Sequence, residues 1–458
     1  MKRSRSEVRV KSHALPELRF EAQSLTSFAG LVIFQKLFSH LKLRARLRAC
    51  FRHRTSSPIF AFSSMVMLLV VHLLLGYREL RHSRFYRDDP MVLRVLGLRQ
   101  LPDVATISRQ LANIDEQSVA NLESLTTELV LQRLARLELQ TLTLDFDGSV
   151  IGTSRRAEGS AIGFNKAKKG QRSYYPLLCT VAQSGQVLSV LNRSGNVHDS
   201  NGARAFIVRC IALARQALPS SSMELRMDSA FFSDEIVAML DSLSVRYTIS
   251  VPFERFAELK EKIEKRERWH DSGNTCECFE QRWKPKSWAR KRRFLFVRQH
   301  APVARTGPLQ LDLFVPVSYQ YSYKVILTNR SDSAADVIAL HNGRGSQEAL
   351  FAELKSQNSF GYIPGRTWRA NRVYMQSAIL AHNLVRELQM STRAPTTRDS
   401  AKRPALWVFD KLETVRLRVV QRAGRLISPN GKLTLSMSSN DAVRKEILDY
   451  LGALDAAA

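Results

Sequence analysis

The chain has 458 residues, a formal net charge of +27 at pH 7 and a sequence pI of about 10.3. Single cores rarely grow beyond roughly 250–300 residues, so we expect two or three structural units. The charge excludes an ordinary near-neutral soluble protein and is typical of one that binds a polyanion, with nucleic acid as the first expectation. Five scattered cysteines without a C-x-x-C pair predict neither disulfides nor a zinc site, and they suit a reducing compartment.

Residues 1–135 form a basic region that we predict to be helical. Its most apolar segment, residues 58–77, is interrupted by two serines and a histidine and is followed directly by charged residues. The uninterrupted stretch is shorter than the roughly 20 residues that cross a bilayer, so we predict a buried helix and no membrane span. The N-terminus lacks an apolar run followed by a small-residue cleavage site, which predicts a cytoplasmic protein.

A run of arginines precedes this apolar helix, and a second helix follows it. The arginines are Arg44, Arg46, Arg48, Arg52 and Arg54. Residues 101–114 carry apolar side chains at helical spacing, and Asp103 or Thr106 would cap their helix. The cluster favours a DNA-binding module of helix-turn-helix type, although such a run of arginines is also the ordinary pattern of a solvated face.

After residue 139 the apolar period changes from helical to extended. The predicted elements follow in this order: strand 141–148, hairpin strands 173–182 and 186–192 around a turn at Gly185, helix 201–217, strand 223–228, helix 233–243 and strand 245–251. Three antiparallel strands followed by alternating helices and strands is the order of a ribonuclease-H-like α/β domain. We therefore predict a mixed sheet covered by helices.

Residues 252–330 interrupt this pattern with a charged helix and the predicted strands 293–299, 309–317 and 322–329. Basic and indole side chains alternate within the segment: Trp283, Trp288, Arg290, Lys291, Arg292 and Arg293. Basic groups contact phosphates and an exposed indole stacks on a base, so we predict a β-rich insertion that contacts nucleic acid. The alternative, that the tryptophans anchor a small sheet under a solvated rim, stays open.

Two aspartates, Asp145 and Asp147, lie two apart in the strand 141–148 and so point to the same face. Leu142, Leu144 and Phe146 supply the opposite, apolar face. On the residues alone, an aspartate that caps the turn after the strand is the simpler interpretation. An EF-hand is excluded, because the position eleven residues beyond Asp145 holds Arg156 where a glutamate is required.

A third aspartate, Asp228, ends the strand 223–228, at the edge where α/β sheets place ligand-binding groups. Carboxylates at the ends of neighbouring strands would make half of a magnesium site. The missing carboxylate must come from a helix after the insertion, and Glu348 is the candidate. The all-oxygen donor set favours magnesium over zinc.

The helix around residue 348 selects one of its two glutamates. Glu348 and Lys355 are seven residues apart and share a face within about 20°, whereas Glu353 lies about 140° away. Gly343 and Gly345 predict a break before the helix restarts with Ser346 as its N-cap. Glu348 would then lie in the first turn, where the helix dipole favours the ionised carboxylate.

The whole pattern resembles the DDE transposases of bacterial insertion sequences, in the cut-and-paste group with a tyrosine-x2-arginine-x3-glutamate-x6-lysine signature. Here the spacing reads His341-x2-Arg344-x3-Glu348-x6-Lys355. Further similar segments are residues 163–178, 194–203, 226–233 and 415–437, so the resemblance extends from about residue 140 to 437. It implies a ribonuclease-H-like catalytic domain in residues 136–251 and 331–395, interrupted by the insertion 252–330. A DNA-binding region 1–135 and a basic C-terminal region 396–458 flank it.

The resemblance also implies the chemistry. Asp147, Asp228 and Glu348 would bind two Mg²⁺ ions, with Mn²⁺ able to substitute and with Asp145 as the fallback first aspartate. Arg344 and Lys355 would hold the DNA phosphates. His341 replaces the usual tyrosine; a histidine can still donate to phosphate, but its charge would vary with pH.

The implied partners are double-stranded DNA, as element ends and target, and a second copy of the chain in the DNA complex. The protein would be cytoplasmic and associated with the bacterial nucleoid when bound to DNA. Two other hypotheses stay open: a catalytically inactive relative that only binds DNA, and a nuclease of the same fold that cuts without joining.

Overall fold

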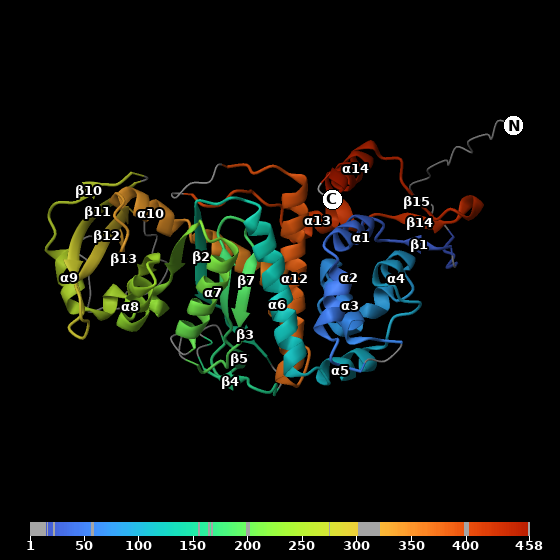
Figure 1. Ribbon diagram of the computed structural model, residues 1–458, viewed down its shortest axis with the longest axis horizontal. Helices are drawn as coiled ribbons and strands as arrows, with labels where there is room; N and C mark the ends of the chain where they lie inside the picture. The colour runs from blue at the N-terminus through green and yellow to red at the C-terminus, as the bar shows by residue number, and fades with distance from the viewer. Residues whose placement is uncertain are drawn as a thin grey trace.

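The computed structural model describes residues 15, 17–21, 23–55, 59–153, 156–163, 165, 168–197, 202–273, 275–300, 321–397 and 403–456. The predicted strand 309–317 lies outside these residues. Figure 1 shows an elongated molecule in which a central sheet has a β-rich extension at one end and a group of helices at the other. The long helix α12 (Trp368–Thr392) stands between the sheet and the helices.

A nine-stranded mixed sheet forms the centre, in the order β10-β11-β12-β13-β9-β8-β2-β6-β7. Its strands are β2 (Thr141–Gly148), β6 (Leu177–Val181), β7 (Val187–Leu191), β8 (Ser222–Met227), β9 (Arg246–Ser250), β10 (His270–Asp271), β11 (Cys276–Trp283), β12 (Arg292–His300) and β13 (Tyr321–Thr328). Strands β2, β6 and β7 are antiparallel neighbours, while β2, β8 and β9 run parallel. This order confirms the predicted ribonuclease-H-like mixed sheet.

The segment 252–330 is continuous with this sheet. Its strands β11, β12 and β13 pair antiparallel in sequence, and β13 pairs directly with β9 of the central strands. Helices α8 (Asp234–Ser242) and α9 (Ala257–Glu264) lie in this part of the molecule (Figure 1). The predicted insertion is thus β-rich, and it extends the sheet instead of forming a separate one.

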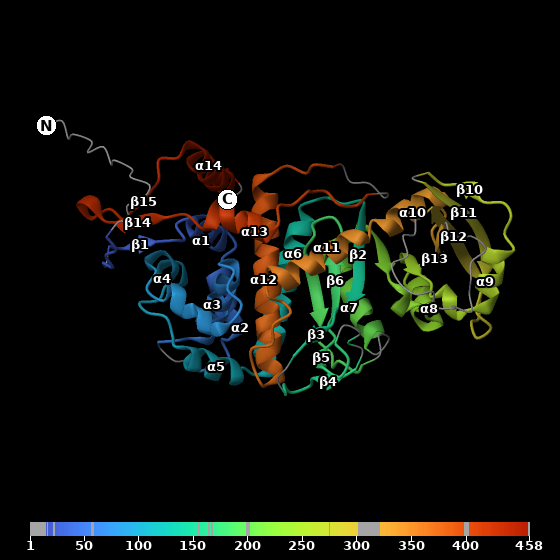
Figure 2. The same cartoon turned by 180° about the vertical axis from the view of Figure 1, so that it is seen from behind.

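Helices cover both faces of the central strands. Leu142, Leu144 and Phe146 are fully buried on one face, in a core shared with α6 (Glu116–Ala135) and α7 (Ala203–Ala217). On the other face, α10 (Ala334–Asn342) and α11 (Gly345–Ser356) run across the sheet (Figure 2). The predicted alternation of β2 is confirmed, and its two aspartates face α11.

The remaining helices form what we call the helical lobe, which combines both ends of the chain. It contains α1 (Leu31–His40), α2 (Leu43–Cys50), α3 (Phe62–Leu74), α4 (Pro90–Leu96), α5 (Val104–Ala112), α13 (Leu412–Val415) and α14 (Asp441–Ala456). Strand β1 (Leu25–Thr26) pairs with β14 (Gly424–Ile427), which pairs with β15 (Thr434–Met437). Residues of the N-terminal helices and of the C-terminal segment therefore share one core.

Two predictions for the helical lobe are confirmed. Helix α3 is buried along almost its whole length, as predicted. As a separate finding, no described helix is long and apolar enough to cross a membrane. Asp103 caps α5, because its carboxylate accepts the Thr106 backbone N–H at 2.7 Å.

The smaller elements complete the description. They are β3 (Ile151–Gly152), β4 (Ala161–Ile162) and β5 (Arg172–Tyr174) in a small sheet, the 3₁₀ turns at Leu80–Tyr86, Ser229–Phe231, Phe253–Arg255 and Pro429–Gly431, and a π-helical turn at Arg416–Val420.

Candidate active site

The carboxyl ends of two parallel strands bring Asp147 and Asp228 to one edge of the sheet. Strands β2 and β8 are paired up to Phe146 and Met227, so each aspartate follows its partner at the same level. The Asp228 carboxylate accepts the Ala230 backbone N–H at 3.0 Å, which fixes the turn after β8. Both aspartates are half-buried.

Glu348 lies in the first turn of α11, as predicted. Helix α10 ends at Asn342 and α11 begins at Gly345, although Gly343 (φ −59°, ψ −15°) and Arg344 (φ −60°, ψ −23°) between them keep right-handed helical angles. The Ser346 hydroxyl donates to the Gly343 carbonyl at 2.9 Å instead of capping α11. The predicted break is therefore confirmed, and the predicted cap is wrong. Glycine at 343 admits a close neighbour: a Cβ there would lie 2.7 Å from Nη1 of Arg226.

Charges meet at this edge. Arg344 donates to Oδ2 of Asp147 at 2.7 Å. Burial raises the pKa of the Asp147 carboxyl to about 7; the Arg344 charge lowers it, and the charges of Asp228 and Glu348 raise it. Burial lowers the pKa of Lys355, whereas the Asp147 charge acts in the opposite direction. Arg344 thus contacts Asp147 directly, and the charges of Asp228 and Glu348 act on the same carboxyl.

The donor set fits a divalent cation in chemistry. Its three side chains are all carboxylates, and their mutual repulsion at Asp147 is what a cation relieves. In the described residues, no three His, Cys, Asp or Glu side chains are close enough to hold a metal ion as they stand. Arg344 is the group that neutralises Asp147 in this conformation.

Asp145, the fallback ligand, has another role. Both of its oxygens accept from Arg226, each at 2.6 Å, and both side chains are buried. A carboxylate whose two oxygens are committed to a buried guanidinium is not available to a metal. The fallback assignment is therefore wrong in this structure, and Asp147 is the candidate on β2.

Glu353 points into the protein, away from the site. Its Oε2 accepts from Arg386 at 2.6 Å, and its Oε1 accepts the Leu412 backbone N–H at 3.0 Å. Glu353 is buried, whereas Glu348 is exposed. The two glutamates of α11 thus have different surroundings, as their angular separation on the helix predicts.

His341 does not reach the surface. Its Nε2 lies 2.9 Å from the Ser250 hydroxyl and its Nδ1 lies 3.0 Å from the Thr248 hydroxyl, both on β9. Burial lowers the pKa of His341 well below its ordinary value, with nearby cations acting in the same direction. The expected phosphate contact with a pH-dependent charge is contradicted, since a buried neutral imidazole joins α10 to the sheet.

A family model described as transposase DDE domain group 1 matches residues 9–458. The chain belongs to the DDE transposase family. As a DNA transposase, it acts by metal-dependent phosphoryl transfer on DNA, and DNA is its partner. No curated protein sequence matches the transposase significantly.

Solved transposase structures resemble the chain only weakly. The piggyBac transposase synaptic complex with hairpin DNA aligns with a TM-score of 0.36 and 10% identity, over 86% of this chain and 80% of that one. The Mos1 paired-end complex with left transposon end has a TM-score of 0.19 and 10% identity, over 43% and 60%. A Mos1 mariner paired-end complex with Mn has 0.18 and 12%, over 36% and 56%. Scores this low add no argument to the family match.

The predicted stacking tryptophans of the transposase are core residues. Trp283 and Trp288 are 7% and 6% exposed and belong to the core of the central sheet. The Trp283 indole N–H donates to Glu258 at 2.8 Å, and Trp288 packs on Phe232 with ring centroids 4.7 Å apart. The structure contradicts base stacking by these rings and supports the alternative that they anchor the sheet.

The basic residues beside them divide into two groups. Arg293 is held by both oxygens of Glu280 at 2.8 and 2.7 Å, and Arg292 pairs with Asp241. Arg290 and Lys291 are exposed at the turn between β11 and β12. Only the second pair is placed as a surface contact requires.

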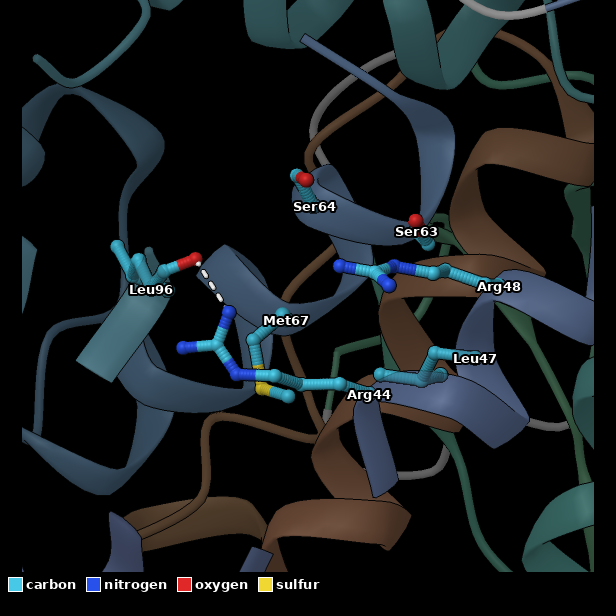
Figure 3. Close-up of a pocket in the computed structure, with 7 residues that line it drawn as sticks. All are labelled: Arg44, Leu47, Arg48, Ser63, Ser64, Met67 and Leu96. Carbon is cyan, nitrogen blue, oxygen red and sulfur yellow. Dashed lines mark hydrogen bonds between the residues drawn. The ribbon is translucent and has the colours of Figure 1, made fainter. Parts of the chain in front are cut away.

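The N-terminal arginines divide in the same way. In Figure 3, Arg44 points to the carbonyl of Leu96, the last residue of α4, and its Nη1 donates to that oxygen at 3.1 Å. Arg48 extends toward Ser63 at the start of α3 in the same view. Arg44 therefore closes the C-terminus of α4, whereas Arg48 is exposed.

Three residues near the site were not predicted: Arg226, Gln347 and Lys324. Gln347, beside Glu348, donates to the Asp145 carbonyl at 3.1 Å and to the Thr180 hydroxyl at 3.0 Å. The Glu348 charge raises the pKa of Lys324, although burial, the largest cause, lowers it. The sequence offered one signal for Arg226: it lies two residues before Asp228, as Asp145 lies two residues before Asp147. A basic and an acidic residue at equivalent positions of two strands indicate a possible ion pair.

Proposed function

We propose that this transposase binds the terminal inverted repeats of an insertion sequence, cleaves DNA at the element ends and joins those ends to target DNA. What supports the proposal is the position of Asp147 and Asp228 after the paired ends of β2 and β8, with the Glu348 charge acting on Asp147, in a chain of the DDE family. Joining two ends calls for two active sites, so we expect a homodimer in the DNA complex. We expect the protein in the cytoplasm, on the bacterial nucleoid when it is bound to DNA.

Asp147, Asp228 and Glu348 are the residues that would hold the cations, two Mg²⁺ with Mn²⁺ as a substitute. When bound, such ions stabilise the charge on the attacking and leaving oxygens of phosphoryl transfer. Arg344 would then exchange Asp147 for a DNA phosphate, because a guanidinium forms charge-assisted hydrogen bonds with either group. Lys355 would hold the same DNA strand, because it lies on the same face of α11 as Glu348, about two turns further along the helix.

The function is tested by incubating the purified protein with a labelled element end, a target plasmid and Mg²⁺. We expect cleaved ends and joined products. Retention of the end without cleavage would favour an inactive DNA-binding relative, and cleavage without joined products would favour a nuclease. Inverted repeats in the DNA that flanks the coding region would supply the sequence of the end.

DNA contact by the exposed residues Arg290 and Lys291 gives a separate expectation. The logarithm of the binding constant should fall steeply with the logarithm of salt concentration, since each phosphate contact releases counterions. Replacing both residues by alanine should reduce that slope by about 2, roughly 1 for each contact. Lys265 is the control, because it already pairs with Glu261 on α9. An unchanged slope in the double variant would remove the two residues from the interface.

A further inference from the structure

One buried ion pair contacts all three elements that carry the candidate catalytic carboxylates. Arg226 and Asp145 are 1% and 2% exposed, and they are register partners on the parallel strands β8 and β2. Asp147 and Asp228 follow them by two residues each, about 7 Å further along each strand. The pair therefore lies next to the two aspartates along the strands, on the side of the sheet interior, and links the two strands that carry them.

The same pair also reaches the glutamate helix. Nη1 of Arg226 donates to the Leu340 carbonyl at 2.9 Å, near the end of α10. Gln347, the residue before Glu348, donates to the backbone carbonyl of Asp145 at 3.1 Å. The passage from α10 to α11 thus rests on Arg226 and Asp145 at both of its ends.

We propose that Arg226 and Asp145 are positioning residues, which set the spacing of Asp147, Asp228 and Glu348 without touching DNA or cations. The proposal rests on the proposed function. Its physical basis is geometric: a displacement of about 1 Å in a catalytic group can cost about 100-fold in rate. The bidentate contact fixes both the distance and the orientation of the two strands, and the third N–H fixes α10 to them.

A merely structural ion pair is the competing explanation. Buried ion pairs replaced by apolar side chains of similar volume often keep or gain stability. The double variant Asp145→Leu/Arg226→Met therefore separates the two roles, because packing is retained while the guanidinium contacts to β2 and α10 are lost. The matched control is Glu224→Leu/Arg330→Met, which removes another buried pair with 0% and 2% exposed side chains from the same sheet.

Three quantities are measured on the full chain: the thermal midpoint, Mn²⁺ affinity by electron paramagnetic resonance without DNA, and the cleavage rate at saturating Mn²⁺ and end DNA. We expect both double variants to fold. Asp145→Leu/Arg226→Met should lose about 100-fold in cleavage rate and about 10-fold in Mn²⁺ affinity, with end binding retained. The control should stay within about threefold of the native protein in both.

A second pair of variants covers the case in which the double variant does not fold. Gly343→Ala keeps every charge but places a Cβ 2.7 Å from Nη1 of Arg226. Gly345→Ala is its control, because no atom lies within 4 Å of a Cβ there. We expect Gly343→Ala to lower the cleavage rate and the Mn²⁺ affinity about 10-fold, and Gly345→Ala to leave both unchanged.

Equal cleavage and Mn²⁺ binding in Asp145→Leu/Arg226→Met and its control would overturn the proposal, as would equal behaviour of the two glycine variants. Failure of the native protein to cleave DNA would instead contradict the proposed function. The two failures are therefore distinguishable.

Discussion

Asp145 and Asp147 lie two residues apart on the same face of β2, and each pairs with an arginine. The two pairs differ in how deeply they are buried. Asp145 is bound through both oxygens to Arg226, and neither side chain is more than 2% exposed. Asp147 has a single contact of 2.7 Å with Arg344, and these side chains are 17% and 15% exposed. Separating the deep pair would leave an uncompensated buried charge, whereas the open pair can exchange partners. The difference in burial therefore supports a structural role for Asp145 and leaves Asp147 as the candidate metal ligand.

The same contrast between a buried and an exposed carboxylate exists on α11, in Glu353 and Glu348. The largest effect is expected when each of these glutamates is replaced by glutamine. Glu348→Gln, like Asp228→Asn, should lower cleavage by at least about 1,000-fold, because metal-assisted charge stabilisation supplies several kcal/mol. End binding and the thermal midpoint should stay near native values. Glu353→Gln should instead cost about 3–5 kcal/mol of unfolding free energy, because it breaks a buried pair with Arg386. Cleavage assays and urea denaturation measure the two effects. Loss of stability in Glu348→Gln and loss of cleavage in Glu353→Gln would reverse the roles given to these glutamates.

Arg344 should give the next largest effect. Arg344→Gln removes a charge-assisted hydrogen bond worth about 1.5–3 kcal/mol, which corresponds to roughly 10–150-fold in single-turnover cleavage. Arg344→Lys keeps the charge but lacks the planar guanidinium, so its cleavage rate should lie between those of Arg344→Gln and the native protein. Native cleavage by Arg344→Gln would restrict this arginine to the resting pair with Asp147.

His341 tests the deep layer. His341→Phe leaves the Thr248 and Ser250 hydroxyls without their partner and should cost about 1–3 kcal/mol of unfolding free energy. Adding Thr248→Val and Ser250→Ala removes those hydroxyls as well and should recover most of the loss. DNA binding per folded molecule should be native in both. Weakened DNA binding with native stability would restore the phosphate-holding role to this position.

The last prediction concerns pH and the helical lobe, where no effect is expected near pH 7. Burial lowers the pKa of His72 to about 3, and its Nδ1 lies 2.6 Å from the Tyr86 hydroxyl. The folded pKa is below the unfolded value of about 6.5, so this stability is complete above pH 6.5 and is lost as pH falls toward 3. Urea denaturation should show a loss of about 1.4 kcal/mol per pH unit well below pH 6.5 from this residue.

The variant His72→Phe/Tyr86→Phe is the control for that slope, because it removes both hydrogen-bonding partners together. It should keep the stability near pH 7 and show a shallower decline in acid. An identical pH slope in the native protein and this variant would mean that His72 is protonated in the folded state.

The sequence was sufficient for the elements of the sheet and insufficient for the depth of their side chains. Period-two alternation located β2, and the rotation along α11 separated Glu348 from Glu353. Asp145 and Asp147 are the same residue type on the same face, so no local pattern distinguishes them. Their partners arrive from β8 and from the passage between α10 and α11, 81 and 197 residues away.

Other predictions depended on packing between distant segments. Trp283 and Trp288 lie in a basic stretch, which looks the same whether an indole is exposed or covered. Packing against Glu258 and Phe232 decides that they are core. Gly343 indicated the break between α10 and α11, but the sequence did not show that glycine there also admits the close approach of Arg226 from another strand.

The contacts between Arg416 and the end of α3 have a consequence for synthesis on the ribosome. The carbonyls that end α3 accept from Arg416 at 3.0 and 3.2 Å, and Arg416 lies 342 residues after Leu74. If synthesis adds about 5–20 residues per second, the ribosome makes Arg416 roughly 15–70 s after α3, and these contacts form only then. A chain truncated before Arg416 would lack these contacts, so the end of α3 depends on a segment made near the end of synthesis.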